Sequence, residues 1–163
     1  MEVHPGWSMV RDGAMQQMIW PEGRHPAPAE LVAKVEMRQL TADDVPEMVA
    51  LAHLTEPGPF GQRTAELGEF FGIFEGGRLL AMSGQRLHIA GFTEVSAVCT
   101  HPDARGRGYA RALVAQVTET ILRGGKRPML HVFAANSEAI RLYEEVGFRL
   151  RRHLHLAAMK RVD

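Results

Sequence analysis

A glycine-rich run, Arg105-Gly106-Arg107-Gly108-Tyr109-Ala110, carries the clearest chemistry in the chain. It follows an apolar, strand-like segment and precedes an amphipathic one. A turn of this kind at the start of a helix leaves backbone N–H groups unpaired, pointing at one spot, with the positive end of the helix dipole behind them. The glycines let a ligand approach the main chain, and the two arginines add positive charge. The run therefore predicts a phosphate site.

A second run lies downstream, from Asn136 to Phe148: Asn136-Ser137-Glu138-Ala139-Ile140-Arg141-Leu142-Tyr143-Glu144-Glu145-Val146-Gly147-Phe148. Asn136 or Ser137 can cap a helix, and Gly147 can end it. Tyr143 lies on the inner face of this predicted helix, with Ile140 and Val146. This run predicts a helix over residues 136–146.

The two runs together resemble motifs of the GNAT acetyltransferase superfamily. Residues 95–110 are similar to its motif A, which ends in Gln/Arg-x-x-Gly-x-Gly/Ala, met here by Arg105, Gly108 and Ala110. Residues 136–148 are similar to its Asn-x-x-Ala-x-x-Leu-Tyr-x-x-x-Gly-Phe pattern. The resemblance covers about residues 35–160, and residues 93–102 look most like the branch of glycine N-acyltransferase-like proteins.

The resemblance implies a site residue by residue. The pyrophosphate of acetyl-CoA would bind the turn formed by Arg105, Gly106, Arg107, Gly108, Tyr109 and Ala110. The pantetheine arm would pair with the main chain of Val98, Cys99 and Thr100 and accept a hydrogen bond from Asn136. Tyr143 would protonate the leaving thiolate. The main-chain N–H of Val98 would serve as the donor to the developing oxyanion.

The amine acceptor must lose a proton, and three residues are candidate bases. Glu94 lies eleven residues before Arg105, the offset of the catalytic glutamate in histone-acetylating relatives. His131 lies five residues before Asn136, where relatives that acetylate protein N-termini often carry glutamate; imidazole exchanges protons near neutral pH. His88 is the third. We favour Glu94, with His131 second; a strand-end carboxylate and a core histidine are the structural alternatives.

The chain predicts a mixed α/β sheet with helices on both faces, in the order β-α-α-β-β-β-α-β-α-β. Strands are expected over 35–40, 70–74, 78–88, 94–100 and 129–133, with one or two more in 148–159, and helices over 41–54, 64–68, 109–123 and 136–146. The resemblance implies the GNAT fold, with a mostly antiparallel sheet splayed at the CoA site. We expect residues 1–34 to be an N-terminal extension, in which Trp7–Trp20 could form a short helix, and residues 35–163 to be the acetyltransferase domain.

Composition excludes several classes of protein. The 163 residues carry 19 basic and 19 acidic side chains, so a broad nucleic-acid-binding surface is not expected. No apolar run approaches the roughly 18 residues of a membrane span. The single cysteine fits a reducing cytoplasm. His153 and His155 share a strand face without a third ligand at a recognisable spacing, so we expect no metal.

These features predict an acetyl-CoA-dependent N-acetyltransferase that transfers an acyl group directly to an amine of a small molecule, an amino acid or a peptide N-terminus. The family-level expectation is a homodimer, with no nucleic-acid or membrane partner. Candidate residues at the acceptor pocket are Phe60, Phe70, Phe71, His88 and Phe92. The alternative is a non-catalytic acyl-CoA-binding or regulatory module on the same fold. ATP binding is disfavoured because no Gly-Lys-Ser/Thr follows the glycines.

Overall fold

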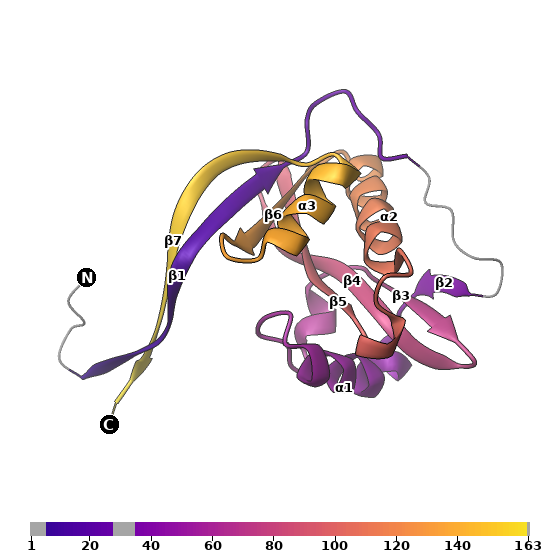
Figure 1. Cartoon of the computed structure of the whole chain (residues 1–163), viewed down its shortest axis with the longest axis horizontal. Coiled ribbons are helices and arrows are strands. Elements are labelled where there is room, and N and C mark those ends of the chain that lie inside the picture. The colour runs from indigo at the N-terminus through magenta and orange to yellow at the C-terminus, as the bar shows by residue number, and fades with distance from the viewer. Residues whose placement is uncertain (1–5, 28–34, 163) are drawn as a thin grey trace.

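The computed structural model describes residues 6–27 and 35–162. Its centre is a seven-stranded sheet with the strand order β2-β3-β4-β5-β6-β1-β7 (Figure 1). The strands are β1 (Trp7–Ile19), β2 (Glu36–Gln39), β3 (Phe70–Glu75), β4 (Arg78–Ile89), β5 (Phe92–Thr100), β6 (Arg127–Phe133) and β7 (Arg149–Arg161). The helices are α1 (Val45–Thr55), α2 (Tyr109–Arg123) and α3 (Ser137–Val146), with short 3-10 turns at Ala42–Asp44, Thr64–Leu67 and Pro102–Ala104. The predicted mixed α/β class is confirmed.

Local sequence signals explain the boundaries near α1 and between β3 and β4. Thr41 and Asp44 form the predicted capping box, in which the Thr41 amide donates to Asp44 Oδ2 at 2.7 Å. Arg38 holds the same carboxylate with two hydrogen bonds, of 2.8 and 2.7 Å. The β3–β4 hairpin turns at Gly76 and Gly77, whose φ angles of +59° and +78° suit glycine.

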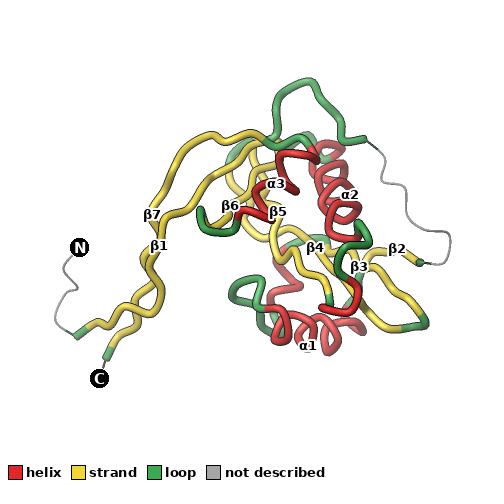
Figure 2. Tube along the Cα trace, in the orientation of Figure 1, coloured by secondary structure: helices red, strands yellow, loops and turns green. Residues whose placement is uncertain are grey.

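Helices cover both faces of the sheet, as predicted (Figure 2). Helices α2 and α3 pack on one face over a core that includes Val95, Leu130 and Phe148. Helix α1 packs on the other face, where its Met48 and Leu51 contact a core that includes Phe70, Met82 and Cys99. Leu130 and Val132 on β6 point toward α2 and α3, so His131 between them points to the α1 face.

Strands β5 and β6 separate part-way along their length. They are the only parallel neighbours among the described strands, and their register runs from Phe92↔Arg127 to Glu94↔Met129 and ends there. On its other edge β5 contains a bulge against β4, between Ser96 and Cys99. Ala97 in this bulge has a φ of +52°, which is uncommon for a residue with a side chain. Beyond Glu94, β5 therefore has an edge that no described strand covers.

The expected short helix over Trp7–Trp20 is wrong, because most of this segment forms β1. Met15–Ile19 pair with β6, and β1 pairs along its length with β7, so the strand is held on both edges. Met18 and Trp20 then enter the core beneath α3. Part of the expected N-terminal extension thus lies inside the sheet.

Beyond Met15, toward the N-terminus, β1 pairs with β7 alone. The two strands leave the body as a curved two-stranded arm, with Trp7 and Arg161 paired near its tip (Figure 1). The closing segment that was expected to hold one or two strands is the single strand β7. We call residues 7–14 of β1 and their partners on β7 the arm.

Candidate active site

The glycine-rich turn has the geometry expected of an anion site. Gly106 and Gly108 have φ angles of +75° and +78°, and Gly108 is the N-cap of α2. The amides of residues 106–111 donate no backbone hydrogen bond to any described residue. A Cβ atom added at either glycine would meet nothing within 4 Å, so the space above the turn is open. Unpaired amides, open space and a helix N-terminus coincide at this point.

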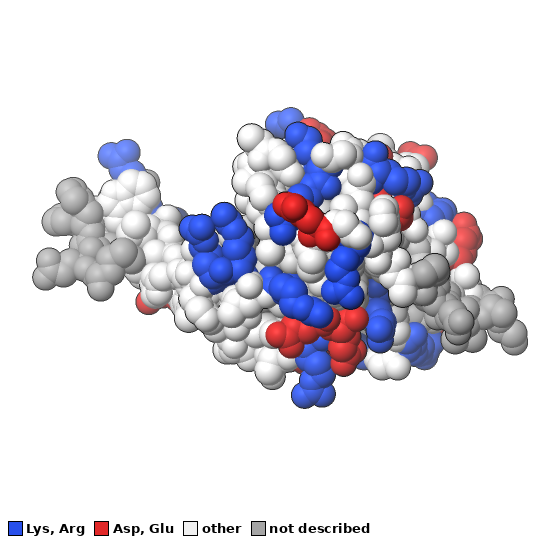
Figure 3. Space-filling view, turned by 90° about the horizontal axis from the view of Figure 1, so that it is seen from above, with Lys and Arg blue, Asp and Glu red and all other residues white. Residues whose placement is uncertain are grey.

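The two arginines of the turn differ in how they are held. Arg107 donates to Glu75 Oε2 at 2.9 Å and to the Asp103 carbonyl at 3.0 Å, so part of its charge is engaged within the protein. Arg105 forms no ion pair with a described residue. Figure 3 shows that basic and acidic side chains are interleaved on the face of the molecule seen from above.

The uncovered edge of β5 runs toward this turn. Val98, Cys99 and Thr100, the predicted pantetheine positions, all lie beyond the last residue that pairs with β6. Main-chain groups on such an edge can pair with an extended ligand as with an added strand. The Thr100 hydroxyl is buried and has no hydrogen-bond partner in the described structure. Burial also raises the pKa of the Cys99 thiol to about 11, which argues against a nucleophilic role.

Helix α3 places Tyr143 and Asn136 on the other side of the opening. Tyr143 is 8% exposed, and its ring packs edge-on against Phe148 at 6.3 Å. Burial raises the pKa of Tyr143 to about 12, so the phenol keeps its proton at neutral pH. The Asn136 side-chain oxygen accepts from the Ala139 amide at 3.1 Å and caps α3, which leaves its NH₂ group for a ligand.

Glu94 and His131, separated in the sequence, are in contact where β5 and β6 begin to diverge. The Nδ1 atom of His131 lies 2.8 Å from Glu94 Oε1, and Arg86 donates to both carboxylate oxygens at 2.9 Å. The Glu94 side chain is 1% exposed. Burial opposes its ionisation, but the hydrogen bonds from His131 and Arg86 outweigh burial and lower the pKa of Glu94. The carboxylate is therefore an ionised, fully engaged group.

Two residues not singled out as site residues complete this network. The Nε2 atom of Gln17 on β1 lies 3.0 Å from His131 Nε2, and Arg151 on β7 donates to Gln17 Oε1 at 2.7 Å. Because the Gln17 oxygen faces Arg151, its NH₂ group faces the ring and His131 Nε2 accepts. Nδ1 then carries the proton toward Glu94. The network therefore orients the His131 ring with Nδ1 toward Glu94 and Nε2 toward Gln17.

The remaining predicted acceptor residues do not gather in one place. His88 donates from Nε2 to the Leu67 carbonyl at 2.7 Å and lines a cavity of about 730 Å³ together with Phe71 and residues of α2. Phe70 is a core residue on the α1 face, and Phe92 lies below the Arg127 guanidinium at 6.0 Å. Of the five, Phe60 alone lines the cavity described next.

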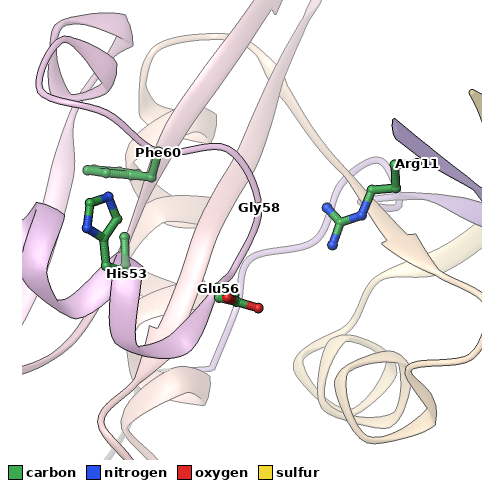
Figure 4. Close-up of a pocket in the computed structure, with 6 residues that line it drawn as sticks. Arg11, His53, Glu56, Gly58 and Phe60 are labelled. Carbon is green, nitrogen blue, oxygen red and sulfur yellow. The ribbon is translucent and has the colours of Figure 1, made fainter. Parts of the chain in front are cut away.

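A cavity of about 350 Å³ lies between the end of α1 and the arm (Figure 4). Arg11 on β1 forms one wall, and His53, Glu56, Gly58 and Phe60 form the other. Arg11, His53, Glu56 and Gly58 are not among the predicted site residues. The local sequence of β1 does not show that this strand lies beside β6. The guanidinium of Arg11 lies 4.8 Å from the centre of the Phe133 ring, at the end of β6.

The FR47-like protein family model matches residues 70–156, which include the turn, β5, β6 and α3. A GNAT-family acetyltransferase structure from Novosphingobium aromaticivorans is 38% identical and superposes with a TM-score of 0.89, covering 100% of this chain and 71% of its own. The chain belongs to the FR47-like family and to the GNAT superfamily of acetyltransferases. The narrower resemblance to glycine N-acyltransferase-like proteins stays a prediction.

Two further comparisons extend this result. A mycothiol acetyltransferase from Saccharopolyspora erythraea is 30% identical over 89% of this chain and 56% of its own length. A GCN5-related N-acetyltransferase structure from Sphaerobacter thermophilus, 21% identical, covers 96% of this chain and 53% of its own, with a TM-score of 0.71, and shares the fold. The chain thus spans little more than half the length of these two relatives. No helix in the described residues is long and apolar enough to cross a membrane.

Proposed function

We propose that this GNAT chain is an acetyl-CoA-dependent N-acetyltransferase that transfers the acetyl group directly to an amine of a small molecule, an amino acid or a peptide N-terminus. One juxtaposition carries the proposal. The uncovered edge of β5 leads into the unpaired amides at the start of α2. The pantetheine arm and the pyrophosphate of acetyl-CoA would therefore have adjoining binding surfaces. No group of three or more metal-ligating side chains is found among the described residues.

The donor side follows from this surface. The amides of residues 106–110 would bind the pyrophosphate, and the main chain of Val98–Thr100 would pair with the pantetheine arm. Asn136 would donate its NH₂ group to the same arm. The acyl oxygen would then accept from the Val98 amide, which stabilises the charge that develops during attack.

The chemical step moves two protons. The acceptor nitrogen attacks the acyl carbon, the C–N bond forms and the C–S bond breaks. Tyr143 would give its proton to the leaving sulfur, and its raised pKa keeps that proton available. Glu94 is bound on both oxygens and has a lowered pKa, so we assign the base to His131, acting through Nε2. Glu94 would hold the ring and stabilise the imidazolium, and the Gln17 amide would move aside.

A second candidate is a non-catalytic acyl-CoA-binding module. It is favoured by one observation: both ring nitrogens of His131 and both oxygens of Glu94 already have protein partners. A structural network that fastens β5 to β6 would have the same contacts.

Two measurements on the full chain test these functions. Calorimetry should show binding of acetyl-CoA and none of ATP; the opposite result would overturn the CoA site. A thiol-release screen over amino acids, polyamines and peptides should find at least one acceptor. Acetyl-CoA binding with no thiol release from any of them would favour the binding module. A homodimer and a cytoplasmic location stay predictions.

A further inference from the structure

The cavity between α1 and the arm contains two opposite charges that lack partners. Arg11 and Glu56 lie on facing walls with open space between them (Figure 4). Neither forms an ion pair with a described residue. The one contact given for the Arg11 guanidinium is with the face of the Phe133 ring, which uses none of its N–H donors in an ion pair with a described residue.

Arg11 and Glu56 are exposed side chains, and the backbone of the α1 wall is fixed. Glu56 is the C-cap of α1, with a φ of +48°, and its amide donates to the Ala52 carbonyl, so its backbone is fixed in a left-handed conformation. Phe60 packs edge-on against Phe70 at 5.8 Å, which fixes the loop that follows α1. A volume of about 350 Å³ is at the lower end of the range for small-molecule sites. The space suits a compact ligand that carries both charges.

The cavity lies on the same face of the sheet as His131, the proposed base. Ala52, in its floor, belongs to the core cluster that contains Cys99 and packs against Ala97 of the β5 bulge. Phe133, beneath Arg11, follows His131 by two residues and therefore points to the same side of β6. A ligand in the cavity can extend along this face toward the opening between β5 and β6.

We propose that the acceptor is a diamino carboxylic acid acetylated on its side-chain amine. Arg11 binds the α-carboxylate with paired N–H donors, and Glu56 accepts from the α-ammonium. This inference rests on the proposed acetyltransferase function. The neutral side-chain nitrogen attacks the acyl carbon, the C–N bond forms and the C–S bond breaks. The sulfur takes a proton from Tyr143, the nitrogen loses one to His131, and the products are a side-chain amide and CoA.

Simpler amines fit the two walls less well. A diamine without a carboxylate leaves Arg11 unpaired, and an amino acid without an α-ammonium leaves Glu56 unpaired. In an amino acid with a single amine, the α-amine is adjacent to the carboxylate. When Arg11 binds the carboxylate, the α-amine therefore stays beside Glu56. Only a longer diamino acid has a second, side-chain amine that can project out of the cavity while both charges are bound.

A matched set of amines tests this on the full chain. We expect thiol release with L-lysine or L-ornithine to exceed that with 6-aminohexanoate and with cadaverine by about tenfold in kcat/KM for each charge removed, a usual effect for a charge-assisted contact. Mass-spectrometric fragmentation of the product should place the acetyl group on the side-chain nitrogen. Glycine, L-lysine and L-ornithine acetylated on the α-nitrogen would overturn the inference.

Variants separate the two walls. Arg11→Gln should raise KM for L-lysine about tenfold and leave KM for cadaverine unchanged, and Glu56→Gln should raise KM for L-lysine but not for 6-aminohexanoate. Lys160→Gln, an exposed cation on the arm, is the control and should change neither. If kcat/KM for cadaverine equals that for L-lysine, the inference fails while the acetyltransferase proposal stands. If acetyl-CoA binds and no amine in any screen releases thiol, the proposed function fails first.

Discussion

Gln17 and His131 occupy facing positions on β1 and β6, and their side-chain nitrogens lie 3.0 Å apart. A residue of the N-terminal strand thereby contacts the ring that we assign as the base. The contact leaves Nε2 as an acceptor and Nδ1 as a donor to Glu94, so the ring is oriented before any acceptor arrives. Outer contacts of this kind often set the tautomer and orientation of a functional histidine.

Replacing Gln17 by leucine tests this orientation. Gln17→Leu removes the donor to Nε2, and we expect kcat to fall at least about tenfold while acetyl-CoA affinity is unchanged. Gln16→Leu is the control, since the neighbouring side chain points to the other face of β1. A kcat identical to that of the unaltered protein would refute a positioning role.

Glu94 should contribute to stability in a pH-dependent manner. Glu94→Gln removes the charge between Arg86 and His131, and we expect a loss of about 3 kcal/mol in the free energy of unfolding at neutral pH. The folded-state pKa of Glu94 lies below its ordinary value of 4.5. Its contribution is therefore present above pH 4.5 and is lost as pH falls through that lower pKa.

Urea unfolding at several pH values measures the effect of Glu94→Gln. The difference between the variant and the unaltered protein should shrink as the pH is lowered below 4.5. Glu66→Gln, which breaks an exposed ion pair with Arg63, is the control and should change little. A difference that stays constant into acid would mean that the Glu94 charge does not stabilise the fold.

The parts of the fold set by local signals were predictable. Helix α2 begins at Tyr109 and ends at Arg123 as expected, since Gly108 and Gly124 mark its ends and its apolar residues recur with helical spacing. The open turn before α2 follows from the same glycines, whereas the donor-side roles of Val98, Asn136 and Tyr143 come from the family resemblance and stay predictions. These boundaries depend on side chains only a few residues apart, which a single sequence displays.

The acceptor side was not predictable because it depends on pairing between distant segments. The apolar residues of β1 fit a helix as readily as a strand, and its role is decided by β6 and β7, more than 110 residues away in the observed contacts. Arg11 and Gln17 could not be placed without that pairing. The sequence does not mark the β5 bulge, because the residue with the positive φ angle is Ala97 and not a glycine. The surrounding strands impose this conformation on Ala97.

Tyr143→Phe removes the proposed acid without removing the ring from the core. We expect kcat to fall about a hundredfold, a usual size for a general acid, with acetyl-CoA affinity unchanged. The folded pKa of about 12 exceeds the ordinary value of 10, so burial of this phenol stabilises the protein below pH 10, and that contribution is lost as pH rises toward 12. The phenolate absorbance that appears near pH 12 should be absent in the variant. An unchanged kcat would show that another group protonates the thiolate.

Gly108→Ala separates the anion site from backbone strain. The added methyl group would stand in the open space above the turn, and we expect acetyl-CoA affinity to fall about tenfold, together with a stability loss of about 1 kcal/mol from the left-handed φ. Gly125→Ala is a matched control, because its φ of +69° is also left-handed and its Cβ would also meet nothing within 4 Å. It should lose similar stability and keep full affinity in calorimetry. Equal affinity losses in both variants would place the pyrophosphate elsewhere.

Cys99 should be unreactive in the folded protein although it lies at a proposed pantetheine position. Burial raises its pKa from 9.0 to about 11, which lowers the thiolate fraction about a hundredfold at pH 8, and the side chain is also shielded from reagent. Because it is the single cysteine, its labelling by a disulfide reagent can be followed without interference. We expect slow labelling of the native chain and rapid labelling in urea. Acetyl-CoA should slow native labelling further, since its pantetheine arm would cover this part of β5. Rapid labelling of the native chain that acetyl-CoA does not slow would contradict both the burial of Cys99 and the proposed path of the pantetheine arm.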